Sequence, residues 1–140
     1  MKLFLDANIL VSVLNKEYPL FTYSSRILSL TDTKSFELFT SPVCLAIAFY
    51  FAEKKTNSLT AKKKIELLCK HLIIAGNSTE SVTKTLKNPS IHDFEDGLKY
   101  YAALENECTC ILTEDKNDFY FSEIEVINCL EFCKKYLISK

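Results

Sequence analysis

The sequence predicts an α/β protein, a three-layer sandwich with a central, mostly parallel sheet of about 4–5 strands flanked by helices. Short apolar runs typical of buried strands alternate along the chain with longer amphipathic segments of helical period. The 140 residues contain only 2 Gly and 3 Pro, without a repeat, a low-complexity stretch or an evident linker. We therefore expect a single domain over residues 1–140.

The strands and helices are expected to follow one another in order. The expected strands are KLFL at 2–5, FELFTS at 36–41, LIIA at 72–75, CTCILT at 108–113 and EVIN at 125–128. The expected helices are 7–15, 22–31, 42–55, 59–71, a short one after Ser78, 92–107 and 129–137. Pro42 suits a first helical turn, and Ser78 is the expected N-cap of its helix. The helix at 42–55 is apolar on nearly every side and is expected to be buried.

The composition excludes some classes of protein. With 17 basic and 18 acidic residues the net charge is -1, which gives no case for wholesale attraction to nucleic acid. The 6 cysteines form no paired CxxC pattern, so we expect reduced, mostly buried thiols outside the mechanism. The N-terminus has no signal-peptide pattern, and no apolar run approaches the ~18 residues of a membrane span. A cytoplasmic protein without membrane contact is expected.

Acidic residues follow two of the expected strands. Asp6 comes directly after the strand at 2–5, and Asp115 and Asp118 follow the strand at 108–113. The carboxyl ends of parallel strands meet at one edge of a sheet, where ligands of open α/β folds bind. Burying a carboxylate among apolar residues costs several kcal/mol unless it is paired. We therefore expect Asp6 to have a partner at this edge.

A helix adds further acids to the same edge. The helix at 92–107 precedes a parallel strand and must run antiparallel to it, so its N-terminus lies near the carboxyl ends of the strands. Asp93 and Asp96, at i and i+3, share a face of this helix. Three segments distant in sequence, LFLD, DFED and LTEDKND, thus bring carboxylates to one rim.

Two interpretations of these acids are open. Clustered carboxylates repel one another unless a cation neutralises them, and oxygen ligands without His or Cys favour Mg²⁺ or Mn²⁺. Such an ion polarises a phosphoryl oxygen, lowers the pKa of a bound water and stabilises the leaving oxygen in phosphodiester hydrolysis. Alternatively, Asp6 and Asp93 are helix N-caps, and Asp115 and Asp118 are loop residues in Asx-turns.

The three segments, in this order, resemble a PIN domain. The family's D-x-N after the first strand is matched by Asp6-Ala7-Asn8, its acidic helix by DFEDGLKYYAA at 93–103, and its T-x-[ND]-x-x-D-F signature by LTEDKNDF at 112–119. The resemblance spans essentially the whole chain. It implies a Mg²⁺/Mn²⁺-dependent ribonuclease, and many small bacterial members are toxins of the VapC type that an antitoxin holds inactive.

The resemblance also implies roles for individual residues. Asp6, Asp96 and Asp118 match the metal-binding acids, and Asp115 falls on the D/N position as a plausible fourth. By the same resemblance, Asn8 matches the polar residue that orients the first Asp. Thr113 matches the strand-end hydroxyl that supports a metal ligand from behind.

One position departs from the family pattern. The family usually carries a Glu in the helix after the second strand, in a phrase like S-x-x-x-L-A-E, and here Ile47 stands at that position. Glu53 is almost two turns further on and is not expected to reach the site, whereas Asp93 is a candidate to compensate. Removing one negative ligand should weaken the binding of a second metal ion.

The primary hypothesis is a metal-dependent endoribonuclease acting on RNA, with a possible antitoxin partner and a homodimeric state expected from the family. A second hypothesis, supported by Ile47, is a PIN-like module that has lost catalysis and binds protein or RNA. A third is a different metal-dependent phosphohydrolase that acts on a small nucleotide, because a fold alone does not determine the substrate.

Overall fold

A computed structural model, which describes residues 1–137, confirms the predicted fold class. One sheet has the strand order β3-β2-β1-β4-β5. The strands are β1 Lys2–Leu5, β2 Glu37–Thr40, β3 Ile73–Ile74, β4 Cys110–Leu112 and β5 Glu125–Ile127. Every pairing between neighbouring strands is parallel, with β1 between β2 and β4. The central position of β1 explains why three consecutive side chains, Leu3 to Leu5, are fully buried.

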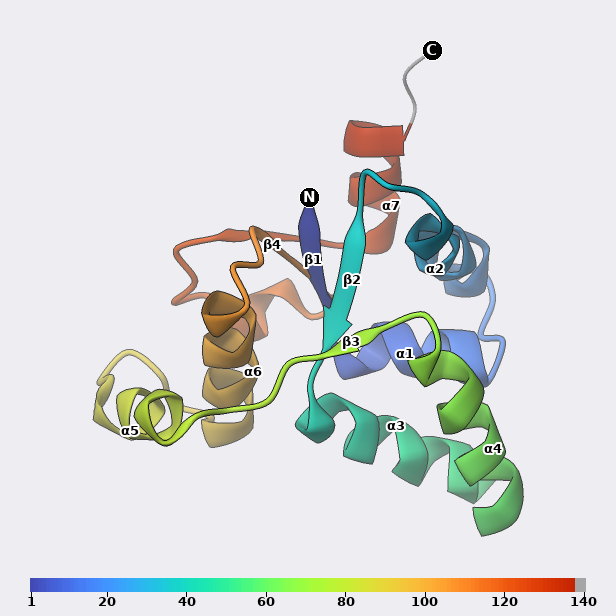
Figure 1. Cartoon of the computed structure of the whole chain (residues 1–140), viewed down its shortest axis with the longest axis horizontal. Coiled ribbons are helices and arrows are strands. Elements are labelled where there is room, and N and C mark those ends of the chain that lie inside the picture. Colours follow the sequence, from blue (N-terminus) through green and yellow to red (C-terminus); the bar gives the residue numbers. More distant parts are fainter. Residues whose placement is uncertain (138–140) are drawn as a thin grey trace.

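Helices cover both faces of the sheet. They are α1 Ala7–Leu14, α2 Leu20–Leu28, α3 Pro42–Lys55, α4 Ser58–Cys69, α5 Thr79–Lys87, α6 Phe94–Glu105 and α7 Cys129–Phe132. Two short 3-10 helices cover Ser29–Asp32 and Lys116–Phe119, and a π-helical turn, Cys133–Leu137, follows α7. In Figure 1, α5 and α6 lie on one side of the sheet, with α1, α2 and α7 on the other. This is the predicted three-layer arrangement.

Two expectations about individual elements need correction. The helix expected at 22–31 begins at Leu20 and ends at Leu28, where the chain tightens into a 3-10 helix. Pro19 precedes it with a helical φ of -81°, which favours the earlier start. The expected burial of α3 is also only partly right. Ala48 and Ala52 are fully buried, but Tyr50 and Phe51 are 54% and 45% exposed.

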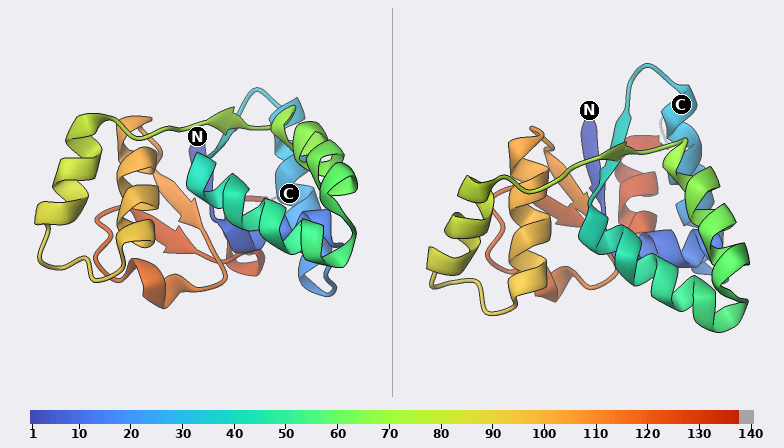
Figure 2. Two further views of the ribbon diagram at one scale, coloured as in Figure 1. Left: turned by 90° about the horizontal axis from the view of Figure 1, so that it is seen from below. Right: turned by 60° about the horizontal axis from the view of Figure 1, so that its bottom comes forward.

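The position of α3 explains this exposure. The helix packs against α1 and α4, whereas α6 touches it in only a few places. Figure 2 (left), seen from below, shows α3 running across the edge at which the strands end. A helix at the rim of a sandwich has one face on the protein and another in solvent, even where its sequence is apolar on both.

Three helices begin at the carboxyl edge of the sheet, as the topology predicts. Asp6 is the N-cap of α1, Ser41 is the N-cap of α3, and Asp93 is the N-cap of α6. Each side chain accepts a hydrogen bond from a backbone N–H of the first turn, which satisfies a donor that the helix itself leaves unpaired. Ser78 caps α5 in the same way, as predicted. The capping interpretation of Asp6 and Asp93 is thus confirmed.

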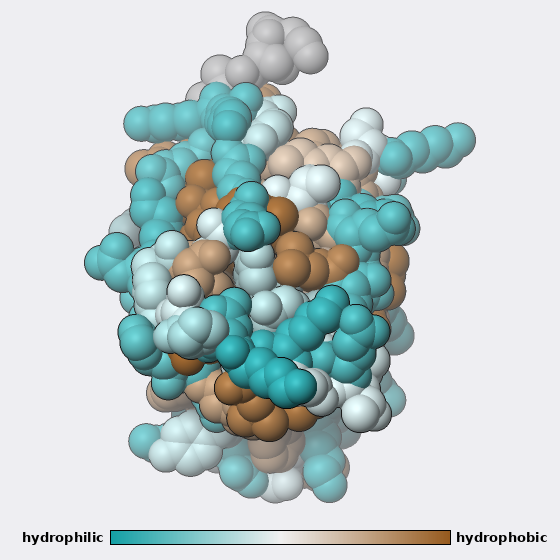
Figure 3. All heavy atoms as spheres, turned by 90° about the vertical axis from the view of Figure 1, so that its left-hand side faces the viewer, coloured by the Kyte–Doolittle hydropathy of each residue, from teal (hydrophilic) through white to brown (hydrophobic). Residues whose placement is uncertain are grey.

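The outer surface on the side of α5 and α6 is mixed in character. Figure 3 shows hydrophilic side chains over most of this face, with smaller hydrophobic patches between them. Within residues 1–137, no helix combines the length and the apolar character that crossing a membrane would need.

Candidate active site

Asp6 is the most buried carboxylate at the carboxyl edge of the sheet, with only 3% of its surface exposed. Its Oδ2 accepts a 2.8 Å hydrogen bond from the hydroxyl of Thr113, which follows the neighbouring strand β4. Its Oδ1 accepts a 2.7 Å hydrogen bond from the N–H of Ala7. Capping α1 therefore uses only Oδ1 of this carboxylate, and Thr113 holds Oδ2.

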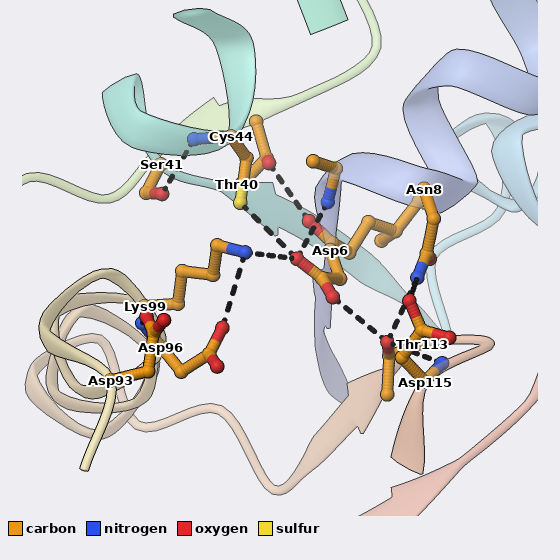
Figure 4. Close-up of polar contacts among 12 residues, drawn as sticks. Asp6, Asn8, Thr40, Ser41, Cys44, Asp93, Asp96, Lys99, Thr113 and Asp115 are labelled. Carbon is orange, nitrogen blue, oxygen red and sulfur yellow. Dashed lines mark hydrogen bonds and ion pairs between the residues drawn. The ribbon is translucent and has the colours of Figure 1, made fainter. Parts of the chain in front are cut away.

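A lysine that the sequence analysis did not consider supplies the cationic partner of Asp6. Lys99 Nζ lies 3.0 Å from Asp6 Oδ1 and 3.5 Å from Asp96 Oδ1 (Figure 4). Burial alone would lower the pKa of Lys99, but the neighbouring negative groups, with Asp6 first among them and Asp96 adding to it, together outweigh burial and raise the pKa above its ordinary value. Lys99 follows Asp96 by three residues, so the two share a helix face. This spacing was the signal available in the sequence.

Asp96 reaches the site from the first turn of α6. The pKa of its carboxyl is raised from 3.8 to about 6, and burial is the largest cause. The charge of Lys99 opposes this rise, whereas the charges of Asp93, Asp118 and Asp6 add to it. The acids of the three predicted segments are therefore close enough to influence one another electrostatically. A carboxyl with a pKa near neutrality among other acids is typical of a functional site.

Asn8 and Thr113 join the N-terminal motif to the segment after β4. Asn8 Nδ2 lies 3.2 Å from Thr113 Oγ1 and 3.3 Å from Asp115 Oδ2, while Asn8 Oδ1 accepts a hydrogen bond from Glu114 N at 3.2 Å. The expectation that Asn8 orients Asp6 thus needs refinement. Asn8 points toward Thr113 and Asp115 (Figure 4), and within residues 1–137 its hydrogen bonds connect it to the Asp6 carboxylate only through the Thr113 hydroxyl.

A pocket of about 400 Å³ opens next to these residues. Its lining includes Asp6, Asn8, Glu17, Lys99, Asp115 and Asp118, together with apolar side chains of α1 and α3. Burial raises the pKa of Asp118, and the charges of Asp115 and Asp6 raise it further. Carboxylates from the end of β1 and from the segment after β4 therefore share this pocket. Asp96 adjoins it through Lys99 rather than lining it.

The apolar part of the pocket includes the position at which the family pattern departs. Ile47 and Phe51, one turn apart on α3, both line the pocket, whereas Glu53 is not among its lining residues. The position where the family usually places a Glu therefore faces the acids. Here it presents a hydrocarbon side chain.

Asp93, the first acid of the DFED segment, has a structural use. Asp93 Oδ1 accepts a 3.0 Å hydrogen bond from the backbone N–H of Asp96, as an N-cap does. It is not one of the residues that line the pocket. Its negative charge still acts on Asp96 and Asp118, and raises the pKa of both.

Most of the cysteines are buried and unpaired, as the sequence predicted. All six are unpaired within residues 1–137, and all but Cys69 are buried. The thiol of Cys44 lies 3.8 Å from Asp6 Oδ1. Burial, followed by the charge of Asp6, raises the pKa of Cys44 to about 11, which favours the protonated thiol near neutral pH.

The chemistry of these donors fits a hard divalent cation. The charged groups around the pocket are carboxylates and one ammonium, without an imidazole or an ionised thiol, and oxygen ligands suit Mg²⁺ or Mn²⁺. Within residues 1–137, no three His, Cys, Asp or Glu side chains are already drawn together as the ligands of one ion. Lys99 instead lies between two of the acids.

Solved structures of known proteins share this fold. VapBC2 from Rickettsia felis, bound to a DNA fragment from its promoter, matches with a TM-score of 0.68 and 20% identity, covering 91% of this chain and 98% of that one. VapBC-1 from nontypeable Haemophilus influenzae matches with a TM-score of 0.68 and 18% identity, over 93% and 99%. VapC20 from Mycobacterium tuberculosis, described as a toxin that cleaves the sarcin-ricin loop, matches with a TM-score of 0.64 and 12% identity, over 88% and 98%.

Sequence comparison agrees with the fold. Ribonuclease VapC1 from Aquifex aeolicus is 26% identical over 138 residues, which are 96% of this chain and 95% of that protein. The family model described as a PIN domain matches residues 2–117. This match includes the strand β1 with Asp6, the acidic helix α6, and the segment after β4 as far as Asn117, one residue before Asp118. The chain belongs to the PIN domain family.

Proposed function

We propose that this PIN domain is a divalent-metal-dependent endoribonuclease and the toxin of a toxin–antitoxin pair. The observation that carries the proposal is the shared pocket of Asp6, Asp115 and Asp118, with Asp96 beside it. The similarity of this chain, over 96% of its length, to a relative named a ribonuclease supports RNA as the substrate.

Each residue has a separate task in this proposal. Asp6, Asp96, Asp115 and Asp118 would hold Mg²⁺ or Mn²⁺, which supplies Lewis-acid activation of the phosphodiester and of the attacking water. Thr113 holds Asp6 through its Oδ2, and Asn8 holds Asp115. These hydrogen bonds fix the orientation of the carboxylates before any ligand arrives, which reduces the reorganisation needed on binding.

The test is cleavage of RNA by the full chain. Incubation with a set of labelled structured RNAs should give internal cleavage in the presence of Mn²⁺ or Mg²⁺, and none with excess EDTA. Asp118→Asn should reduce the cleavage rate by at least about 100-fold, because it removes one of the few charged ligands. Asp32→Asn, which removes an exposed acid outside the pocket, is the matched control and should cleave normally.

A catalytically weakened module is the second candidate, and Ile47 is the observation that favours it. An apolar side chain in the pocket removes one ligand that the family usually supplies. The two candidates differ in the same assay. RNA that is bound but not cleaved at millimolar Mn²⁺, with no difference between the wild type and Asp118→Asn, would contradict the ribonuclease proposal.

The antitoxin is proposed from the neighbours. Two of the matching structures, from Rickettsia felis and Haemophilus influenzae, are named as VapBC complexes. We expect an adjoining reading frame to encode a small partner protein whose N-terminal part binds DNA. This partner should co-purify with the chain and inhibit its cleavage of RNA. The homodimeric state expected from the family is tested by light scattering during size-exclusion chromatography.

A further inference from the structure

Lys99 is a buried ammonium group inside a cluster of acids. It extends from the middle of α6 to the wall of the pocket, and only 6% of its surface is exposed. A buried charge without a partner is costly, and here the partners are Asp6 at 3.0 Å and Asp96 at 3.5 Å. No other basic residue lines this pocket within residues 1–137.

The hydrogen bonds of Asp6 show what this ammonium does to the carboxylate. Oδ1 already accepts from the N–H of Ala7 at 2.7 Å and has Lys99 Nζ at 3.0 Å and the Cys44 thiol at 3.8 Å, so its surroundings are filled by donors. Oδ2 accepts from Thr113 at 2.8 Å and keeps one lone pair. A metal ion that binds Oδ1 must displace the ammonium of Lys99. A metal ion that binds Oδ2 shares the carboxylate with that ammonium and is repelled by it.

We propose that Lys99 is a built-in cation of this site, which competes with a divalent metal ion for Asp6 and Asp96. The inference rests on the proposed function, because it assumes that these acids bind such an ion. Lys99 neutralises the acids when the metal ion is absent, and it lowers the affinity of the site for the metal ion. Lys99 is therefore a positioning residue for the carboxylates and a determinant of metal affinity.

The test measures Mn²⁺ binding rather than activity. Lys99→Gln removes the charge but keeps an N–H donor that can bond to Asp6. In isothermal titration calorimetry of the full chain, this variant should bind Mn²⁺ at least about tenfold more tightly than the wild type, because a positive charge a few Å from the ion is gone. Its melting temperature in EDTA should be lower than that of the wild type, and saturating Mn²⁺ should recover the loss.

Two matched variants separate charge from other effects. Lys99→Arg keeps the positive charge and should retain the weak Mn²⁺ affinity of the wild type. Lys84→Gln removes an equivalent charge from an exposed pair with Glu80 on α5, and should leave Mn²⁺ affinity unchanged. If Lys99→Gln does not fold without metal, the dependence of its melting temperature on Mn²⁺ concentration, measured beside that of the wild type, gives the affinity of the folded state.

The outcomes distinguish this inference from the function on which it rests. Equal Mn²⁺ affinity in the wild type and Lys99→Gln, or weaker affinity in the variant, overturns the role of Lys99 and leaves the metal-dependent ribonuclease intact. Absence of Mn²⁺ binding in both proteins overturns both proposals. Tighter binding in Lys99→Gln but not in Lys99→Arg supports them.

Discussion

The hydroxyl of Thr113 donates a 2.8 Å hydrogen bond to Asp6 Oδ2 between residues 107 positions apart in sequence. Thr113 is fully buried and also receives the N–H of Asp115 at 3.1 Å and the amide of Asn8 at 3.2 Å. One side chain thus joins the end of β1, the start of α1 and the segment after β4. The neighbouring strands β1 and β4 make this contact possible, because their carboxyl ends lie side by side.

Thr113→Val should therefore lower both stability and activity. Valine has nearly the same shape but leaves a buried acceptor on Asp6 without its donor, at a cost of about 1–3 kcal/mol in the free energy of unfolding. Chemical denaturation measures this loss, and RNA cleavage should fall by about 10–100-fold as Asp6 and Asp115 lose their orientation. Thr113→Ser keeps the hydroxyl and serves as the control. Equal behaviour of the Val and Ser variants would show that this hydrogen bond has no such role.

Ile47→Glu should strengthen the binding of Mn²⁺. The side chain at this position lines the pocket that holds Asp6 and Asp118, so a carboxylate here adds a hard oxygen ligand to an existing set. Without metal, the added negative charge should lower the melting temperature through repulsion among the acids.

Titration with Mn²⁺, followed by calorimetry, measures the gain in affinity from Ile47→Glu. Ala46→Glu places the same charge on the exposed neighbouring position of α3 and should bind Mn²⁺ like the wild type. If both Glu variants gain equally, the effect comes from net charge and not from a ligand at position 47.

The pKa of Asp96 predicts a pH dependence of stability in the metal-free protein. Burial raises this pKa from 3.8 to about 6, so the folded state holds a proton that the unfolded chain has released between these pH values. The contribution of Asp96 to stability is therefore fully present below pH 3.8 and is lost as the pH rises through 6. Asp96→Asn removes this dependence.

Thermal unfolding in EDTA measures this effect as a difference between two proteins. The melting temperature of Asp96→Asn should rise relative to that of the wild type as the pH increases from about 4 to about 7. Asp32→Asn, at an exposed position outside the pocket, controls for the removal of one charge. A difference that stays constant over this range would contradict the raised pKa.

Gly97 predicts the sensitivity of α6 to a single methyl group. A Cβ at this position would meet Thr85 Cγ2 at 2.5 Å and Ile91 Cγ2 at 2.8 Å, closer than ordinary packing allows. Gly97→Ala should therefore cost about 1–3 kcal/mol in the free energy of unfolding, despite the higher helix propensity of alanine. The movement of α6 that relieves these contacts would also displace the neighbouring Asp96.

Gly76→Ala is the matched control for Gly97→Ala, because nothing lies within 4 Å of its added Cβ. Its free energy of unfolding in urea should stay within about 0.5 kcal/mol of the wild-type value. A similar loss in both variants would show that the close packing between α5 and α6 does not determine the effect.

Much of the fold was predictable because the strands have apolar cores, most clearly the central strand β1. Leu3 to Leu5 read as a buried parallel strand, and in the structure they lie in the centre of the sheet without exposed surface. Apolar character alone did not reveal how α3 is placed. Its sequence is apolar at both Ala48 and Phe51, yet only the first is buried, because the helix lies at the rim of the sandwich.

The sequence by itself determined that acids from three segments meet at one edge, because the parallel topology places strand ends and the start of α6 together. Only the tertiary structure decided how they are arranged. Asp6 has Lys99 as its partner, Asn8 acts on Asp115 and Thr113, and Asp93 caps its helix. The reason is physical: spacing along a chain gives the face of an element. Distances of 3 Å between side chains depend on how the elements pack.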